Sequence, residues 1–319
     1  MKIVVLERNS VGTDISIEGI TSLGEAVVYP NTVADEVVER IHDAEIIVAN
    51  KVPLNEGTLK DAPNVKLICE FATGFDNVDI AYCRSRGIKV ANIVGYSTDS
   101  VAQHTFALCL YVLEKLKRYD DYVKSGTYAA QSRFSNFDLP FFELAGKTWG
   151  IVGMGNIGRK VAQIAAAFGC RVIFYSVTGK SSCTDYEKVD FDTLLAESDV
   201  LSLHCPLSDL TRHLINKEAL KKMKSSAVLV NVARGPVICD EDLYEALVEG
   251  EIAGAGLDVT STEPMKESNP LSRIQDSSRL IITPHMAWAS VEARIRCVNE
   301  TAENIKAFLS GGNRNIVNL

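Results

Sequence analysis

The stretch TWGIVGMGNIG, residues 148–158, decides the fold of this chain. An apolar run typical of a buried strand leads into Gly153, Gly155 and Gly158, and a helix-like segment follows. In dinucleotide sites the first such glycine permits the turn, the second lets the backbone approach a pyrophosphate, and the third lets the helix pack on the strand. The helix N-terminus then offers free N–H groups to the phosphates. We expect a dinucleotide-binding β-α-β unit here; a tight turn without a ligand is the alternative.

Outward from this motif, short apolar runs alternate with helix-like stretches in both directions. Because strands of a parallel sheet are buried on both faces, they read as continuous apolar runs, so this alternation predicts parallel sheets covered by helices. The runs expected to be strands are 3–6, 46–49, 67–71, 89–93, 148–153, 171–176, 200–204, 227–233, 253–259 and 280–283.

Two helical patterns organise these strands into two α/β domains. One pattern, 100–125, predicts a long helix between the two series of strands, and the other, 291–309, predicts a last helix that packs on the first domain. The length of 319 residues also favours two domains. We expect a substrate domain in 1–98, a cofactor domain in 99–288 and a C-terminal segment, 289–319, that returns to the substrate domain.

Composition excludes several other classes of protein. The formal net charge of -8 would repel a nucleic-acid backbone, and it would repel a small anionic substrate unless a local cation binds it. The eight cysteines form no CxxC pair and no cluster with histidine, so we expect reduced thiols, no disulfides and no metal site. No apolar run approaches a membrane span or a signal-peptide core. The cytoplasm is the expected compartment, with neither a nucleic acid nor a membrane as partner.

Polar residues stand at the ends of the apolar strands in the second series. Since ligands bind at the carboxyl ends of parallel strands, these positions are candidate site residues. They are Ser176, Cys205 and Pro206, the NVAR segment 231–234, Asp258 and His285. Arg234 and His285 are the most informative, because core packing would favour neither there. The alternatives are an arginine that pairs with a surface acid and a histidine that caps a turn.

Glu263 completes a candidate catalytic set with these two residues. A carboxylate beside an imidazole favours its charged form, so His285 would be able to give a proton to a carbonyl oxygen. Arg234 would grip a substrate carboxylate through two parallel hydrogen bonds. With a nicotinamide cofactor, these groups suit reversible hydride transfer to a small anionic 2-oxo acid.

The sequence closely resembles the D-isomer-specific 2-hydroxyacid dehydrogenases from about Cys69 to Trp288. The resemblance rests on the ordered motifs ATGFDNVD, YSTDSVAQH, ELAGKTWGIVGMGNIG, LHCPL, VNVARGPVI, AGLDV, EP and TPH. It is strongest for the glycerate dehydrogenase or hydroxypyruvate reductase branch. The resemblance implies an α/β protein in which a Rossmann-type cofactor domain is inserted into a flavodoxin-like substrate domain, with parallel sheets in both, and it implies a homodimer.

The resemblance also implies roles for individual residues. Arg234 would bind the substrate, His285 would be the general acid and base, and Glu263 would orient and charge it. The backbone amides of Thr73 and Gly74 would also bind the substrate carboxylate. The cofactor contacts implied are Thr73, the motif glycines (Gly153, Gly155, Gly158) with Asn156 and Ile157 at the pyrophosphate, Cys205 and Pro206 at the adenine, Val232 and Ala233 at the nicotinamide ribose, and Asp258 at the nicotinamide amide.

One departure from the family pattern concerns the choice between NAD and NADP. Many members carry an acid where this chain has Ser176, and that acid binds the adenine ribose of NAD and repels the 2′-phosphate of NADP. Lys180, four residues further on, could supply a positive charge to that phosphate. We expect measurable use of NADPH; a harmless variant that still uses NAD is the alternative.

Three competing functions stay open at this point. A formate dehydrogenase would share the architecture, but it has no oxygen to protonate and so no need for Glu263 and His285. A nucleotide-sensing, corepressor-like interaction protein would share the fold without turnover. Among substrates, hydroxypyruvate and glyoxylate lead, larger 2-oxo acids such as phenylpyruvate are alternatives, and the loop ATGFDN adds no basic residue for a phosphorylated one.

Overall fold

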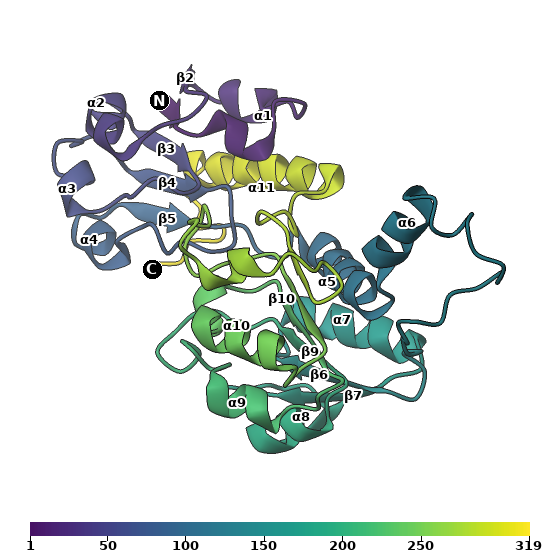
Figure 1. Ribbon diagram of the computed structural model, residues 1–319. Helices are drawn as coiled ribbons and strands as arrows, with labels where there is room; N and C mark the ends of the chain where they lie inside the picture. The colour runs from purple at the N-terminus through teal and green to yellow at the C-terminus, as the bar shows by residue number, and fades with distance from the viewer. The chain divides into compact units, whose positions relative to one another are not determined.

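The structure is a computed structural model that describes residues 1–319. The chain divides into two compact units. Unit 1 contains residues 1–97 and 288–319, and unit 2 contains residues 98–287. Each unit is built on one sheet whose strands are all parallel, as the strand pairings show, and the helices lie on its faces (Figure 1).

The sheet of unit 1 has the strand order β2-β1-β3-β4-β5, which is the flavodoxin-like order. Its strands are β1 (Lys2–Val5), β2 (Glu25–Val28), β3 (Ile46–Ala49), β4 (Leu67–Glu70) and β5 (Lys89–Ala91). Every residue of β3 and β4 is buried. That burial explains why these strands read as unbroken apolar runs, since both faces of the sheet are covered.

Helices cover both faces of this sheet. They are α1 (Glu18–Thr21), α2 (Val37–Ile41), α3 (Glu56–Leu59), α4 (Ile80–Ser85) and α11 (Val291–Leu309), with short 3-10 helices at Arg8–Val11 and Ala34–Glu36. Ile46 and Val48 of β3 pack with α1 and α11, and the alternate residues Ile47 and Ala49 pack with α2, α3 and α4. The last helix therefore belongs to the core of unit 1.

The sheet of unit 2 has seven strands in the order β12-β11-β10-β9-β6-β7-β8. They are β6 (Thr148–Val152), β7 (Arg171–Tyr175), β8 (Glu187–Lys188), β9 (Val200–Leu203), β10 (Val228–Asn231), β11 (Gly254–Leu257) and β12 (Leu280–Ile282). This is the doubly wound Rossmann order extended by one strand, and it confirms the predicted fold class for this part of the chain. The order reverses between β6 and β9, where such sheets bind their ligands.

Two groups of helices cover unit 2. Its helices are α5 (Thr98–Leu113), α6 (Leu116–Lys124), α7 (Asn156–Ala167), α8 (Phe191–Glu197), α9 (Lys217–Lys222) and α10 (Asp240–Glu249), with 3-10 helices at Gly235–Val237 and Pro270–Arg273. The helices α8, α9 and α10 share one apolar cluster with β6, β9, β10 and β11. Helix α5 packs on β10, β11 and α7, and its Phe106 ring stacks on Trp149 at 4.5 Å.

The long helix expected over 100–125 is two helices instead. Helix α5 ends at Leu113, and Lys115 takes a left-handed backbone conformation with φ of 56° before α6 begins. The Lys115 ammonium reaches the carbonyl oxygen of Ser278 at 3.0 Å. The helical pattern indicated a single helix because apolar residues continue past the break, although no residue of α6 is buried. Helix α6 and the segment after it extend away from the rest of unit 2 (Figure 1).

Two strands were not predicted, and both lie at sheet edges. Strand β2 is only partly buried, and β8 is two exposed residues long. An edge strand needs no apolar run because one side of it faces solvent. The other strands begin and end within about two residues of the predicted runs.

Candidate active site

The glycine motif forms the turn between β6 and α7. Gly153 has a φ of 94°, and a Cβ there would lie 2.8 Å from the carbonyl oxygen of His204, so both the turn and the space require glycine. A Cβ on Gly158 would lie 2.2 Å from the carbonyl oxygen of Gly153, which shows how closely α7 packs on the turn. Around Gly155 the space is open, with no atom within 4 Å of an added Cβ.

The N-terminus of α7 is ready to bind an anion. Its N-cap is Gly155, which has no side chain to accept the first N–H groups, and no acidic residue lies in the first turn. Asn156 and Ile157 are the first residues of this twelve-residue helix. Free N–H groups, the positive end of the helix dipole and open space above Gly155 together fit a pyrophosphate.

Ser176 follows β7 and begins a tight loop. Its carbonyl oxygen accepts from the backbone N–H of Gly179 at 2.9 Å, and its hydroxyl oxygen accepts from the N–H of Ser181 at 3.2 Å. Residues 176–182 contain no acid, and Lys180 is exposed in the loop. The end of β7 therefore carries no negative charge that would oppose a ribose phosphate.

Arg159 is a residue that the sequence reading missed at this loop. It lies in α7, directly after the glycine motif, and is half-buried. One guanidinium nitrogen lies 3.5 Å from the Ser182 hydroxyl. Its place four residues after Gly155, about one helical turn, is the sequence signal that could have found it. Lys180 on the loop after β7 and Arg159, which reaches that loop from α7, are thus two cations at this place.

The segments after β9 and β10 lie at the same carboxyl edge of the sheet. Cys205 is buried, and burial raises the pKa of its thiol to about 11, so it is not a thiolate at neutral pH. Pro206 follows it, and its carbonyl oxygen accepts from the Thr211 hydroxyl at 2.7 Å. Val232 and Ala233 are each 9% exposed. Their backbone is shaped by Asn231, whose side chain accepts from the N–H of Ala233 at 3.0 Å.

Arg234 ends the segment after β10. The Asn231 amide donates to the Arg234 carbonyl oxygen at 3.0 Å, and one guanidinium N–H of Arg234 donates to the Ala233 carbonyl oxygen at 2.8 Å. Its backbone is extended, with φ of -144°. Arg234 therefore stands at the end of a buried strand on a backbone that Asn231 holds in place.

His285 and Glu263 form a direct pair in unit 2. The Nδ1 atom of His285 lies 2.7 Å from Oε2 of Glu263, and the other carboxylate oxygen accepts from the Thr260 N–H at 3.3 Å. The side chains are 27% and 33% exposed, so both can meet a ligand. His285 has a φ of 57°, an uncommon conformation for a residue other than glycine. Two segments, after β11 and after β12, thus come together to form an acid–imidazole pair.

Asp258, at the end of β11, is 1% exposed and accepts several hydrogen bonds. Its Oδ1 accepts from the Thr283 hydroxyl at 2.6 Å and the Met286 N–H at 2.7 Å, and its Oδ2 accepts from the Ala287 N–H at 2.8 Å. Burial alone would raise the pKa of this carboxyl, but the hydrogen bonds outweigh burial and hold the pKa below its usual value. Asp258 is therefore a buried carboxylate that organises the backbone around His285.

Thr73 and Gly74 lie in unit 1, in the loop after β4. The Thr73 hydroxyl donates to the carbonyl oxygen of Ile93 at 2.6 Å, and the Asn92 amide donates to the carbonyl oxygen of Thr73 at 2.7 Å. The loop is thus fixed to the segment after β5. Glu70, the last residue of β4, is fully buried.

Residues 1–319 hold no group of three or more His, Cys, Asp or Glu side chains that could bind a metal ion. No helix has both the length and the apolar character to cross a bilayer. All eight cysteines are free thiols.

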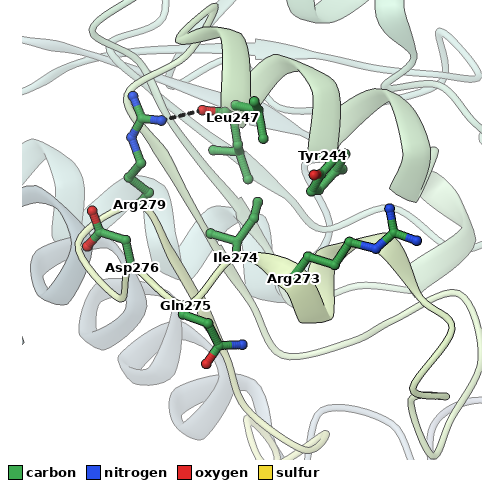
Figure 2. Close-up of a pocket in the computed structure, with 8 residues that line it drawn as sticks. Tyr244, Leu247, Arg273, Ile274, Gln275, Asp276 and Arg279 are labelled. Carbon is green, nitrogen blue, oxygen red and sulfur yellow. Dashed lines mark hydrogen bonds between the residues drawn. The ribbon is translucent and has the colours of Figure 1, made fainter.

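A shallow pocket of about 350 Å³ lies elsewhere in unit 2, between α10 and the segment before β12. Figure 2 shows that the Arg279 guanidinium there donates to the carbonyl oxygen of Leu247 at the end of α10. Arg273 lies over the ring of Tyr244 at 5.9 Å. The pocket sits where β12 begins, and the glycine motif and His285 sit where strands end. It therefore has no part in the candidate site.

The Rossmann sheet, the uncapped α7 N-terminus at its switch point and the acid–histidine pair at the same carboxyl edge of the sheet define a nicotinamide-dependent dehydrogenase. Residues 106–287, more than half of the chain, match the family model "D-isomer specific 2-hydroxyacid dehydrogenase, NAD binding domain". The chain belongs to the D-isomer specific 2-hydroxyacid dehydrogenase family, as its motifs predicted.

Relatives of known name agree with this family. The chain is 39% identical to a hydroxypyruvate reductase of Blautia hydrogenotrophica over 100% of both chains. It is 39% identical to a glycerate dehydrogenase of Methylorubrum extorquens over 99% of this chain and 98% of that one. A crystal structure of a D-lactate dehydrogenase of Aquifex aeolicus complexed with NAD and lactic acid superposes with a TM-score of 0.88 at 31% identity, over 100% of this chain and 99% of that one.

Proposed function

We propose that this protein reduces a small 2-oxo acid to the D-2-hydroxy acid with a reduced nicotinamide cofactor, and that it catalyses the reverse oxidation. The observation that carries this proposal is the 2.7 Å pair between His285 and Glu263, at the carboxyl edge of the sheet that also carries the glycine motif. A formate dehydrogenase transfers no proton to a substrate oxygen. The acid–imidazole pair therefore favours an enzyme that acts on a carbonyl.

In this proposal His285 moves the proton. Glu263 holds Nδ1, so Nε2 is the ring nitrogen that donates a proton to the substrate carbonyl oxygen and takes it back in the oxidation. Arg234 binds the substrate carboxylate with two parallel hydrogen bonds and polarises the adjacent carbonyl. It is also the local cation that a protein of net charge -8 needs in order to bind an anionic substrate. Thr73 and Gly74 donate further hydrogen bonds to that carboxylate.

The nicotinamide, when bound, supplies or accepts the hydride. We assign its pyrophosphate to the open N-terminus of α7, at Gly155, Asn156 and Ile157. The remaining assignments follow the family resemblance. They are Cys205 and Pro206 for the adenine, Val232 and Ala233 for the nicotinamide ribose, Asp258 for the carboxamide, Thr73 as a further contact, and Ser176 with Lys180 for the adenine ribose.

For the cofactor, we propose that NADPH is used and is modestly preferred. The support is the absence of an acid in residues 176–182, together with Lys180 on that loop and Arg159, which reaches the loop from α7. A phosphate on the ribose would meet these two cations, whereas the family acid that repels it is replaced by Ser176.

For the substrate, we propose hydroxypyruvate or glyoxylate. The support is the 39% identity to relatives named hydroxypyruvate reductase and glycerate dehydrogenase. Larger 2-oxo acids such as phenylpyruvate are the alternative that a substrate panel distinguishes.

We further propose a homodimer that forms through unit 2. Four phenylalanines are exposed in the segment after α6, at Phe134, Phe137, Phe141 and Phe142, and Phe134 is 89% exposed. A second copy of the chain would bury these rings. Light scattering on the wild type and on Phe134→Ser/Phe137→Ser tests the dimer, since a monomer in the wild type contradicts the proposal.

Cytoplasmic localisation stays a prediction from the sequence.

The experiment that tests the function is a panel of 2-oxo acids assayed with NADH and with NADPH at one ionic strength. We expect loss of reduced-cofactor absorbance with hydroxypyruvate or glyoxylate. Chiral analysis of the glycerate formed from hydroxypyruvate should give the D-isomer, whereas the glycolate formed from glyoxylate is achiral. Turnover of phenylpyruvate alone would move the substrate to the larger acids. No turnover with any acid, together with tight binding of the dinucleotide, would favour the sensor protein over an enzyme.

A further inference from the structure

Helix α5 runs antiparallel to β11 in close register. A Cβ on Gly254 would lie 2.5 Å from Cγ1 of Val112, and a Cβ on Gly256 would lie 2.8 Å from Cβ of Leu108. Four residues of helix rise about 6 Å and two residues of strand about 6.6 Å, so the two elements stay in step. The next step brings His104 of α5 to Asp258, the residue that follows β11.

His104 reaches Asp258 through Thr283. Its Nε2 lies 2.9 Å from the Thr283 hydroxyl oxygen, which lies 2.6 Å from Oδ1 of Asp258, and the direct distance from Nε2 to Oδ1 is 3.5 Å. A hydroxyl has one proton, and an ionised carboxylate can only accept, so Thr283 donates to Asp258. The Nε2 of His104 therefore carries a proton and donates to Thr283.

The same carboxylate holds the backbone on the far side of His285. The N–H groups of Met286 and Ala287 donate to it, and the N–H of His285 donates to the Asp258 carbonyl oxygen at 2.8 Å. His285 itself has a φ of 57°. A left-handed residue other than glycine persists only where its surroundings hold it, so this backbone depends on Asp258.

We propose that His104 is a positioning residue for the reaction, because through Thr283 it fixes the Asp258 carboxylate and with it the backbone that presents the His285 imidazole. This inference rests on the proposed function. His104 does not touch the reacting atoms; it acts on the geometry of the residue that does. Catalysis is sensitive to such geometry, since a misplacement of about 1 Å can cost roughly a hundredfold in rate.

The surroundings of His104 separate this role from a packing role. Its neighbours Val101, Thr105 and Leu108 are buried, and they attach α5 to the rest of unit 2. The His104 side chain is 24% exposed and is not part of an apolar cluster. Removing its ring nitrogen should therefore change the site more than it changes folding.

Two amide variants test the proposal, because they place a donor at different depths. The side-chain nitrogen of glutamine can take the place of Nε2. The asparagine side chain is shorter, so its nitrogen reaches only the position of Nδ1. We expect His104→Asn to lower kcat about tenfold with little change in the KM of the 2-oxo acid, and His104→Gln to keep kcat within about twofold of wild type. Gln103→Ala, an exposed change one residue away, is the matched control for α5.

Thr283 supplies the second half of the test. Thr283→Val removes the hydroxyl at nearly constant shape, and Thr283→Ser keeps it. We expect the valine variant to match His104→Asn, the serine variant to match wild type, and His104→Asn/Thr283→Val to be no slower than either single variant, since all three break one chain of hydrogen bonds.

A readout without turnover accompanies the kinetics. The amide ¹H and ¹⁵N shifts of Met286 and Ala287 report their hydrogen bonds to Asp258, and we expect them to move in His104→Asn but not in His104→Gln or Gln103→Ala. Wild-type kcat and amide shifts in His104→Asn, or equal losses in both amide variants with a lower Tm, would overturn the positioning role. Absence of turnover in the wild type would instead overturn the proposed function, and the amide shifts would still decide the role of His104.

Discussion

His285 and Glu263 meet at 2.7 Å across 22 residues of sequence, and the histidine does so from a left-handed backbone. The substitution that tests the imidazole must tolerate this backbone, and asparagine does so better than alanine. We expect His285→Asn to lower kcat by about 10² to 10⁴, because the proton donor acts in the transition state, and to leave the dinucleotide affinity near wild type. Steady-state turnover and a fluorescence titration with the cofactor measure the two effects. Near-normal turnover would remove His285 from the mechanism.

Glu263→Gln keeps the shape of the side chain and removes its charge. Since a hydrogen bond to a charged partner contributes about 1.5 to 3 kcal/mol, we expect kcat to fall roughly 10- to 150-fold. Glu267→Gln, an exposed change on the same loop, is the control. Equal rates for the two variants would show that Glu263 does not act on His285.

Arg234→Ala should damage both the KM of the 2-oxo acid and kcat, because the carboxylate is bound in the ground state and in the transition state. Arg234→Lys keeps the charge and loses the planar pair of donors, so we expect it to recover only part of the loss. Initial rates over a range of 2-oxo acid concentrations measure both constants. An unchanged KM in the alanine variant would reject the carboxylate role.

Ser176→Asp places a negative charge at the end of β7. The aspartate can still accept from the Ser181 N–H, so we expect the loop to hold and the ratio of kcat/KM values to shift toward NADH. Ser176→Asn, of similar size and without the charge, should shift the ratio much less. Because phosphate contacts are screened by salt, both cofactors are compared at one ionic strength. The same ratio in wild type and in Ser176→Asp would show that this position does not contact the ribose.

Glu70→Gln should change the pH dependence of stability. Burial raises the pKa of Glu70 to about 8, although a hydrogen bond from Asn77 opposes the rise, and its Oε2 has no hydrogen-bond partner. The folded chain then keeps a proton that the unfolded chain releases above about pH 4.5. The free energy of unfolding therefore falls as the pH rises from about 4.5 to 8, and this group lowers it no further above pH 8.

The glutamine variant cannot ionise, so its free energy of unfolding should exceed that of wild type by an amount that grows with pH in this window, by at most about 1.4 kcal/mol per pH unit. Denaturant unfolding of both proteins at pH 5 and pH 8 measures it. A difference that is the same at both values would contradict the buried, protonated state of Glu70.

Local patterns in the sequence predicted most of the fold. Apolar runs predict both sheets, the glycine turn and nearly all strand positions. The reason is that parallel strands are buried on both faces and therefore consist of continuous apolar residues. The edge strands β2 and β8 could not be predicted in this way, because they lack apolar runs. The break at Lys115 could not be predicted either, because it depends on a contact of this lysine with Ser278, far away in the sequence.

For the site, strand ends indicated Arg234, Asp258 and His285, because one rule places ligands at the carboxyl edge. His104 gave no such signal. It lies on a helix, and its connection to Asp258 exists only because two glycines let α5 settle onto β11. No pattern in one sequence states which helix covers which strand.

The two ends of unit 2 are tied to each other: the Ser100 hydroxyl donates to the Ala287 carbonyl oxygen at 2.6 Å, close to where the chain enters unit 2 and where it leaves. Unit 2 is thus a contiguous insertion with adjacent ends, which places little demand on the chain around it. Unit 1 is discontinuous, and its β5 pairs with Ile316, near the very end of the chain. During synthesis on the ribosome, the part of unit 1 made before unit 2 must therefore wait for the part made after it, and the inserted unit is the one free to fold early.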